Sequence, residues 1–220
     1  MAELDIDKML EQNEKKEKAK KEKSRMNVIM MAIGGAAALG IIAVIVSMLV
    51  MGGSSVSFFP VEPGVKSLYN KKGKSPEERV FLDKKESLYG CECSVLNIID
   101  KGSYATRQEY YCVDKEKGYA RLAYSENFGK KEKDDFVILP YLIKEGREWD
   151  AGKVRDAVVK AVISGHETLM TPVGEIDALR VDYKALPYMD TTIWYAKDFG
   201  VVKEVNNLTA DETSLISYGE

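Results

Sequence analysis

Two hydrophobic patterns divide this chain. Residues 28–51 form an uninterrupted run of 24 residues without a charge. At about 1.5 Å per residue, such a run makes a helix roughly 36 Å long, which is enough to cross a hydrocarbon core roughly 30 Å thick. We therefore predict one transmembrane helix over residues 26–51. Beyond it, apolar residues recur in short runs separated by turns, which is typical of an antiparallel sheet.

The short runs predict a meander of β-hairpins. Apolar and polar positions alternate in segments rich in valine, isoleucine and tyrosine, and glycine-containing turns separate the segments. The predicted fold class is mainly β, a curved antiparallel sheet that resembles half of a barrel, preceded by the transmembrane helix. We expect strands at residues 89–99, 104–114, 119–124, 136–139, 166–170, 177–183, 191–196 and 201–205.

Two further segments carry signals of a helix. Residues 153–163 have helical spacing of apolar positions but also the valine content of a strand, and we favour a strand over residues 158–170. Residues 75–82 begin with a serine that can cap a helix, a proline suited to the first turn, and a glutamate three residues after the cap. We therefore predict a short helix there.

Basic residues predict the orientation in the membrane. Residues 1–25 contain eight lysines and arginines, whereas the first basic residue after the span is Lys66. Cationic flanks stay on the cytoplasmic side. The apolar run is longer than that of a cleaved signal peptide, so we expect an uncleaved signal anchor. The predicted organisation is a cytoplasmic tail (1–25), the span (26–51), a linker (52–58) and an extracytoplasmic domain (59–220).

The predicted span gives the chain its first partner, the lipid bilayer of the plasma (inner) membrane, which residues 28–51 cross once. Ala32, Ala36 and Gly40 are spaced four residues apart and form a flat helix face. Flat faces of this kind let two membrane helices pack closely. One alternative is therefore that the chain forms a homodimer through these three residues. The other is that they have no role in packing, since small residues are common in membrane helices.

Size and charge limit what the outer region does. About 165 residues are sufficient for a single domain with a core. Outside the tail, 24 basic residues stand against 28 acidic ones, a net charge of −4. A domain with this charge is a poor partner for anionic polymers, so we predict no nucleic-acid binding.

Several motifs in the C-terminal half resemble a known group of proteins. They are Leu139-Pro140, Gly146-Arg147-Glu148-Trp149, the run from Thr171 to Val181, and the run from Trp194 to Lys203. Over residues 135–206 the chain is similar to uncharacterised bacterial cell-envelope proteins and lipoproteins. The resemblance implies a curved sheet similar to the half-barrel of lipoprotein carriers. The chain departs from that group at Ile176, where an aromatic residue is usual, and in lacking a lipidated cysteine.

Large aromatic residues are the candidates for ligand binding. A strongly curved sheet must fill its concave face with its own side chains, with loops or with a bound molecule. If an apolar ligand binds there, we expect it to contact several of Trp149, Trp194, Tyr110, Tyr124 and Tyr195. A core filled by the chain itself is the alternative.

The cysteines predict a disulfide. If Lys101-Gly102 is a two-residue hairpin turn, then Cys91 faces Cys112 at a non-hydrogen-bonded site, where Cα atoms lie about 4.5 Å apart. A disulfide spans this separation. Outside the cytoplasm we expect a Cys91–Cys112 bridge, with Cys93 free or exchanging.

Other chemistry has weaker support. A zinc site would need the three cysteines and His166, but the Cys-x-Cys spacing is unusual for zinc and the histidine is more than 50 residues away. The chain has no glycine-rich phosphate loop, no His-Glu-x-x-His pair and no nucleophile elbow. We therefore predict no metal, no cofactor and no enzymatic activity.

These observations favour a non-enzymatic binding or scaffold module of the bacterial cell envelope with an envelope protein as its partner. Two alternatives stay open. One is a carrier or sensor that holds an apolar ligand or a lipidated partner in the concave face. The other is an envelope hydrolase, which requires titratable groups that converge in a cleft.

Overall fold

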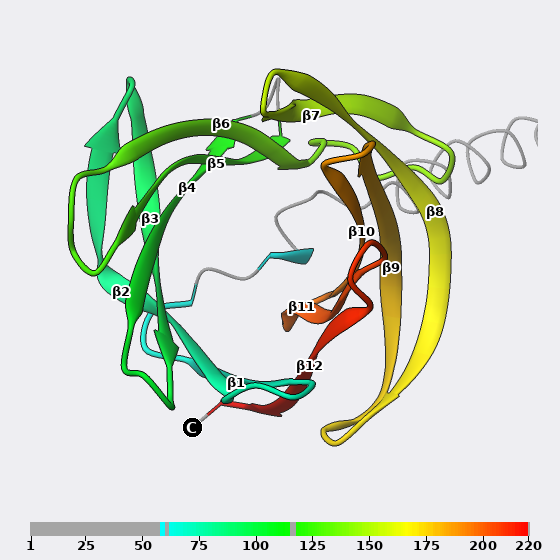
Figure 1. Ribbon diagram of the computed structural model, residues 1–220, viewed down its shortest axis with the longest axis horizontal. Coiled ribbons are helices and arrows are strands. Elements are labelled where there is room, and N and C mark those ends of the chain that lie inside the picture. The colour runs from blue at the N-terminus through cyan, green and yellow to red at the C-terminus, as the bar shows by residue number, and fades with distance from the viewer. Residues whose placement is uncertain (1–57, 60–61, 115–117, 220) are drawn as a thin grey trace, which may run out of the picture. The chain divides into compact units, whose positions relative to one another are not determined.

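The described part of the chain is a single antiparallel sheet. A computed structural model describes residues 58–59, 62–114 and 118–219. Within these residues, twelve strands follow one another along the chain (Figure 1). They are β1 (Lys66–Lys71), β2 (Glu77–Leu88), β3 (Cys91–Asp100), β4 (Thr106–Asp114), β5 (Gly118–Glu126), β6 (Glu132–Leu139), β7 (Glu148–Val154), β8 (Ala157–Thr171), β9 (Gly174–Ala185), β10 (Met189–Ala196), β11 (Gly200–Asn206) and β12 (Asp211–Tyr218).

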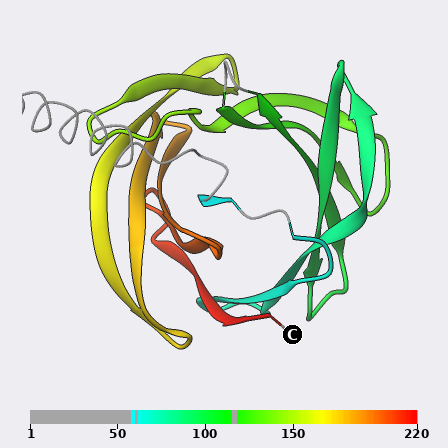
Figure 2. The same cartoon turned by 180° about the vertical axis from the view of Figure 1, so that it is seen from behind.

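The first and last strands meet in the middle of the sheet. The strand order is β6-β5-β4-β3-β2-β1-β12-β11-β10-β9-β8-β7, so each half of the chain makes a six-stranded meander and the pairing of β1 with β12 joins the two. Ser67 lies opposite Tyr218, and Lys71 lies opposite Thr213. The sheet curls strongly and forms a barrel-like ring when viewed from either side (Figures 1 and 2).

Side chains, rather than a backbone ladder, connect the two edges of the sheet. Among the described strands, β6 and β7 are the outermost and do not pair with each other. The indole N–H of Trp149 on β7 donates to the carbonyl of Val137 on β6 at 3.0 Å. From β9, the hydroxyl of Tyr183 reaches past the edge and donates to the carbonyl of Ile138 on β6 at 2.5 Å. The edges approach closely at Gly152, where a Cβ would lie 2.9 Å from the ring of Phe136. The sheet is therefore nearly closed.

The predicted fold class is confirmed in its main point and corrected in its detail. The region is mainly β and its curved sheet is antiparallel, as expected. The sheet is a nearly closed ring of twelve strands, not half of a barrel. The prediction counted too few strands because it missed β1, β2, β7 and β12, and these strands complete the ring.

The helix predicted over residues 75–82 is wrong, because β2 covers most of this segment. Glu77 and Arg79, two residues apart, both line the interior of the ring, as alternate side chains of a strand do. Pairing with β1 and β3 on both sides outweighs the local capping signal. The ambiguous segment 153–163 contains the end of β7, a turn at Arg155 and Asp156, and the first residues of β8. The strand that we favoured over residues 158–170 is confirmed, because β8 covers all of it.

The predicted membrane span lies outside the described residues. This holds for the tail 1–25, the helix 26–51, nearly all of the linker 52–58, and the face made by Ala32, Ala36 and Gly40. In the part of the chain that the structure does describe, no helix has the length and hydropathy to cross a membrane.

The two faces of the sheet hold two apolar clusters. The larger cluster fills much of the inside of the ring and contains Tyr183, Tyr195 and Leu179, which are almost fully buried. The smaller cluster contains Cys93, Val95, Tyr110, Cys112 and Ala123. Register places Tyr110 opposite Ala123 on β4 and β5.

The predicted disulfide is confirmed, but not the register from which we derived it. Cys91 and Cys112 are bonded, with Cα atoms 6.3 Å apart, and Cys93 is a buried free thiol. Ser94 faces Tyr111, so the register is shifted by two residues from the predicted one. The turn is longer than predicted, since β3 ends at Asp100 and β4 begins at Thr106. A two-residue shift keeps every side chain on its face, so the bond joins diagonal neighbours.

We expect loss of this disulfide to destabilise the domain. A cross-link between residues 21 apart in sequence should contribute about 3 kcal/mol, because it restricts the unfolded chain. Cys91→Ala should therefore lower the free energy of unfolding by about that amount in urea denaturation of the full chain in detergent.

Cys93→Ala is the matched control, and it should cost about 1 kcal/mol from lost packing alone. A reducing agent should weaken the wild-type protein and leave Cys91→Ala unchanged. Equal sensitivity of both proteins to the reducing agent would contradict the assignment.

Candidate functional site

The inside of the ring holds a cavity of about 570 Å³. Strands from both halves of the chain supply its walls. On each of these strands, every second side chain points inward. On β4 these residues are Arg107, Glu109 and Tyr111, and on β10 they include Ile193 and Tyr195. The volume lies within the range of small-molecule binding sites in proteins.

The cavity walls are apolar and charged in nearly equal parts. The apolar and aromatic side chains are Phe59, Leu96, Ile98, Tyr111, Phe136, Ile138, Val154, Tyr183, Met189, Ile193, Tyr195 and Val201. The charged side chains are Lys71, Lys72, Lys74, Glu77, Arg79, Arg107, Glu109, Arg121, Asp134, Lys153, Glu204, Asp211 and Glu212. Charged residues rarely line the inside of a closed sheet unless they are paired.

A buried glutamate organises the first group of charges. Oε1 of Glu109 lies 3.1 Å from Nη1 of Arg121 and 2.9 Å from Nε of Arg107. The Arg107 N–H is not directed at this oxygen, so that contact is an ion pair without a hydrogen bond. Arg121 also pairs with Asp134, and the Tyr111 hydroxyl donates to Glu109. Burial alone would raise the pKa of Glu109. The two arginines lower it by more than burial raises it, so the pKa of Glu109 lies below the ordinary value.

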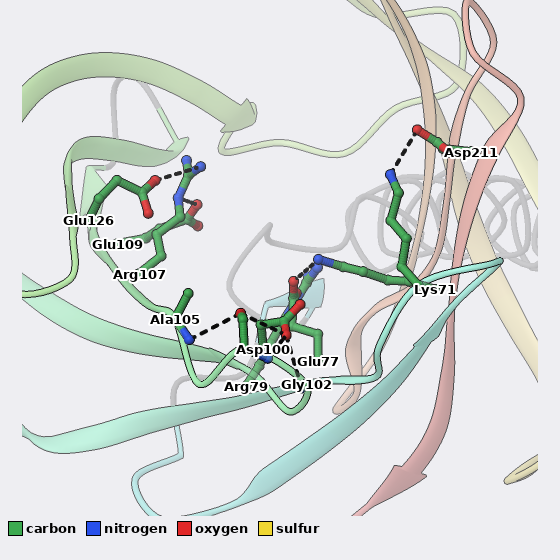
Figure 3. A network of polar contacts seen from close by, with 12 residues as sticks. Lys71, Glu77, Arg79, Asp100, Gly102, Ala105, Arg107, Glu109, Glu126 and Asp211 are labelled. Atoms are coloured by element: carbon green, nitrogen blue, oxygen red, sulfur yellow. Dashed lines mark hydrogen bonds and ion pairs between the residues drawn. The ribbon is translucent and has the colours of Figure 1, made fainter.

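A second group of charges lies on β1 and β2 (Figure 3). Glu77 pairs with Lys71 and, at 2.7 Å, with Arg79. The Arg79 guanidinium also lies 4.2 Å from the centre of the Tyr69 ring. Burial alone would raise the pKa of Glu77, but Arg79 and Lys71 lower it below the ordinary value. Burial alone would lower the pKa of Arg79, but Glu77 raises it above the ordinary value, so both groups stay charged.

The two ends of the cavity differ in chemistry. Lysines lie at the end where β1 turns into β2, and Lys74 pairs with Asp211 of β12 at 3.2 Å. Towards the other end, Phe59 stacks on Tyr119 with ring centres 4.3 Å apart. A smaller cavity of about 40 Å³ lies next to this end and shares Phe59, Arg79, Leu96 and Val201 with the larger one. The interior is therefore polar at one end and aromatic at the other.

Of the five aromatic residues expected to bind a ligand, Tyr195 lines the cavity. Trp149 is on the same face but lies at the junction of β6 and β7, where its indole N–H is used. The Tyr124 hydroxyl donates to Glu132 at 2.6 Å, and the Arg107 guanidinium lies over the Tyr124 ring.

The other two aromatic candidates belong to other parts of the sheet. Tyr110 is in the smaller cluster beside Cys112. Trp194 faces Arg180 across β9 and β10, and its indole N–H donates to Glu167 at 2.8 Å. The structure therefore does not bring the five candidates together around the larger cavity.

Sequence reasoning missed the charged residues of the cavity and Phe59. A signal for the former was present, because Glu77 and Arg79, like Arg107 and Glu109, are opposite charges two residues apart. In a strand this spacing places both side chains on one face. No signal marked Phe59, since its position in the ring depends on contacts with distant strands.

The four residues that a zinc site would need do not come together in the described residues. They contain no group of three or more histidine, cysteine or acidic side chains that is placed to hold a metal. Cys91 and Cys112 are joined to each other, and His166 contacts Asp177 at 3.2 Å on the exposed side of β8.

Neither a protein-family model nor a curated protein matches this chain. Two solved structures are similar to it. One is described as a "putative exported protein with YMCC-like fold" from Bacteroides fragilis, with 16% identity, a TM-score of 0.47, and coverage of 74% of this chain and 99% of that one. The other is a "putative lipoprotein" from Parabacteroides distasonis, with 14% identity, a TM-score of 0.35, and coverage of 73% and 97%. Neither similarity is high enough to transfer a function, and the resemblance to lipoprotein carriers stays a prediction.

The charge network predicts a specific loss of stability in acid. The pKa of Glu109 is lower in the folded chain than its ordinary value of 4.5, so the unfolded chain binds more protons below about pH 4.5. The stabilisation is present above that pH and is lost as pH falls through the folded pKa. Glu109→Gln should therefore reduce the fall in Tm between pH 7 and pH 3.

The same variant should be less stable than wild type at pH 7, because Arg107 and Arg121 lose a charged partner. Glu92→Gln, an exposed change on β3, is the control and should keep the wild-type pH dependence. An unaltered pH dependence in Glu109→Gln would contradict the role of this residue.

Proposed function

We propose that this protein is a membrane-anchored, extracytoplasmic binding module of the bacterial cell envelope. It acts by binding, not by catalysis. Its ligand is amphiphilic and lies inside the ring of strands, with its apolar part against the aromatic end and its polar part against the charged end. The observation that carries this proposal is the cavity of about 570 Å³ with both kinds of wall.

The cavity is a better candidate for binding than the edges of the sheet. A scaffold would bind a partner through an exposed apolar patch or through an unpaired edge strand. Here the edge strands β6 and β7 lie against each other, and Trp149 and Tyr183 use two edge carbonyls of β6. Little of the β6 edge near these carbonyls is therefore available to a partner, whereas the cavity offers several inward-facing side chains.

The state of the buried carboxylates supports binding over hydrolysis. A general acid at neutral pH needs a raised pKa. The pKa values of Glu77 and Glu109 are instead lowered by neighbouring cations, which keeps both groups ionised and paired. Paired charges of this kind orient and solvate a polar group of a ligand.

Two features support a position outside the cytoplasm. The disulfide between Cys91 and Cys112 is of a kind that forms in oxidising compartments. The basic tail before residues 28–51 favours export of everything that follows. The membrane anchor itself is part of the proposal.

A bulky side chain in the cavity should block the proposed ligand. Met189 lines the cavity and is half-buried, so Met189→Trp should reduce the volume without unfolding the sheet. We expect it to weaken binding of a fluorescent amphiphile, 11-(dansylamino)undecanoic acid, by about tenfold or more. The measurement is a fluorescence titration of the full chain in nanodiscs, corrected with empty nanodiscs.

Met170→Trp is the matched control, because Met170 is 81% exposed on β8 and absent from the cavity walls. It should bind the probe as wild type does. If Met189→Trp and Met170→Trp bind the probe with equal affinity, the probe binds outside the cavity. If neither the variants nor the wild-type protein bind it, the proposed function is contradicted.

The proposed topology has its own test. Alkaline phosphatase folds only where its disulfides form, so a fusion after Glu220 should be active in bacterial cells. A cytoplasmic reporter at the same position should be inactive. Mass spectrometry of the purified chain should find residues 1–51 still attached, and activity of only the cytoplasmic reporter would contradict export.

A further inference from the structure

Phe59 fills an aromatic box inside the ring, although it belongs to none of the strands. Its side chain is only 7% exposed. Its ring centre lies 4.3 Å from that of Tyr119, 5.1 Å from Tyr111, 6.1 Å from Phe81 and 6.3 Å from Tyr195. The strands thus form the box and a separate segment supplies its occupant.

The box borders both cavities of the interior. Phe59 is one of four residues that line the larger and the smaller cavity together. If the ring of Phe59 left the box, the space between the two cavities would become available to a longer molecule. The position of Phe59 therefore limits how deeply a ligand can enter.

One polar atom of the box has no partner. The hydroxyl of Tyr119 is buried and makes no hydrogen bond to any described residue, and the Tyr119 side chain is 0% exposed. Four other buried tyrosines of the interior use their hydroxyls: Tyr111 donates to Glu109, Tyr69 donates to the carbonyl of Val201, and the hydroxyls of Tyr183 and Tyr195 bond to each other. A buried hydroxyl without a partner is uncommon in folded proteins and requires an explanation.

The stacked Phe59 ring cannot satisfy this hydroxyl, because a phenyl side chain has no lone-pair acceptor. A ligand group with a carbonyl oxygen could satisfy it. The aromatic walls accept a flat or apolar group, as the presence of Phe59 shows. The box therefore matches an apolar group that carries a single hydrogen-bond acceptor.

We propose that the aromatic box is a ligand subsite that Phe59 occupies in the free chain, and that it accepts an apolar group whose carbonyl oxygen takes a hydrogen bond from Tyr119. The inference rests on the proposed function, because it names the part of the ligand that reaches the end of the cavity. An ester, a ketone or an amide attached to an apolar chain has this chemistry.

The first experiment opens the box and tests its chemistry. Phe59→Ala should bind acetophenone and its near-isostere cumene, which lacks the carbonyl. Adding Tyr119→Phe should weaken acetophenone binding about three- to tenfold and change cumene binding less than twofold. The measurement is a ligand-observed NMR titration of the full chain in nanodiscs, where partitioning of each probe into lipid is common to both variants and cancels.

Equal effects of Tyr119→Phe on the two probes would overturn the assignment of the acceptor. Phe59→Leu gives a second background if Phe59→Ala does not fold, because it keeps more of the packing. Failure of both folded variants to bind either probe would overturn the subsite.

The second experiment tests displacement in the otherwise native chain. With Phe59→4-fluorophenylalanine, the ¹⁹F resonance should move when 11-(dansylamino)undecanoic acid binds, because the ring leaves the field of Tyr119 and Tyr111. A bound probe with an unchanged resonance would overturn displacement and leave the proposed function intact. A probe that does not bind at all would count against the proposed function, whereas the acetophenone comparison tests the subsite by itself.

Discussion

The pairing of β1 with β12 is the constraint on which the remaining structure depends. It joins strands from the two ends of the described region, so the twelve strands form one sheet only when the last strand pairs with the first. Without this pairing, each half would be a six-stranded meander with an additional open edge, which is a site for aggregation. The cavity also depends on it, because Glu109 comes from the first half and Tyr195 from the second. Formation of such a distant contact has an entropic cost that local hairpins do not have.

The charged walls explain why the ring keeps an interior space. An apolar interior of this size would gain by collapse, since apolar surfaces pack to exclude water. Charged groups resist complete burial unless each finds a partner, and Glu109, Arg121 and Asp134 satisfy one another across β4, β5 and β6. Their ion pairs connect neighbouring strands and do not cross the cavity. The network therefore stabilises the wall while the space beside it stays accessible.

Sequence patterns predicted the parts of this structure that depend on short-range order. Alternation located most strands from β3 onwards, and the disulfide between Cys91 and Cys112 was found despite a wrong register, because a shift of two residues preserves the face. β2 was mistaken for a helix because a local capping pattern does not reveal the strands on either side. The site was harder to predict, because register shifts next to Tyr111 and Tyr195 interrupt the simple alternation from which a facing direction is inferred.

The difference between the two ends of the interior determines how the proposed ligand would lie. At the charged end, Lys72 and Lys153 add to the paired charges and favour a polar or anionic head group. At the aromatic end, Phe59 and Tyr119 disfavour a second charge, because burial among aromatic rings would remove its hydration. A molecule with charges at both ends is therefore a poor fit, and one with a single polar head is a good one. The free hydroxyl of Tyr119 then distinguishes ligands that carry a carbonyl within the apolar part from simple hydrocarbon chains.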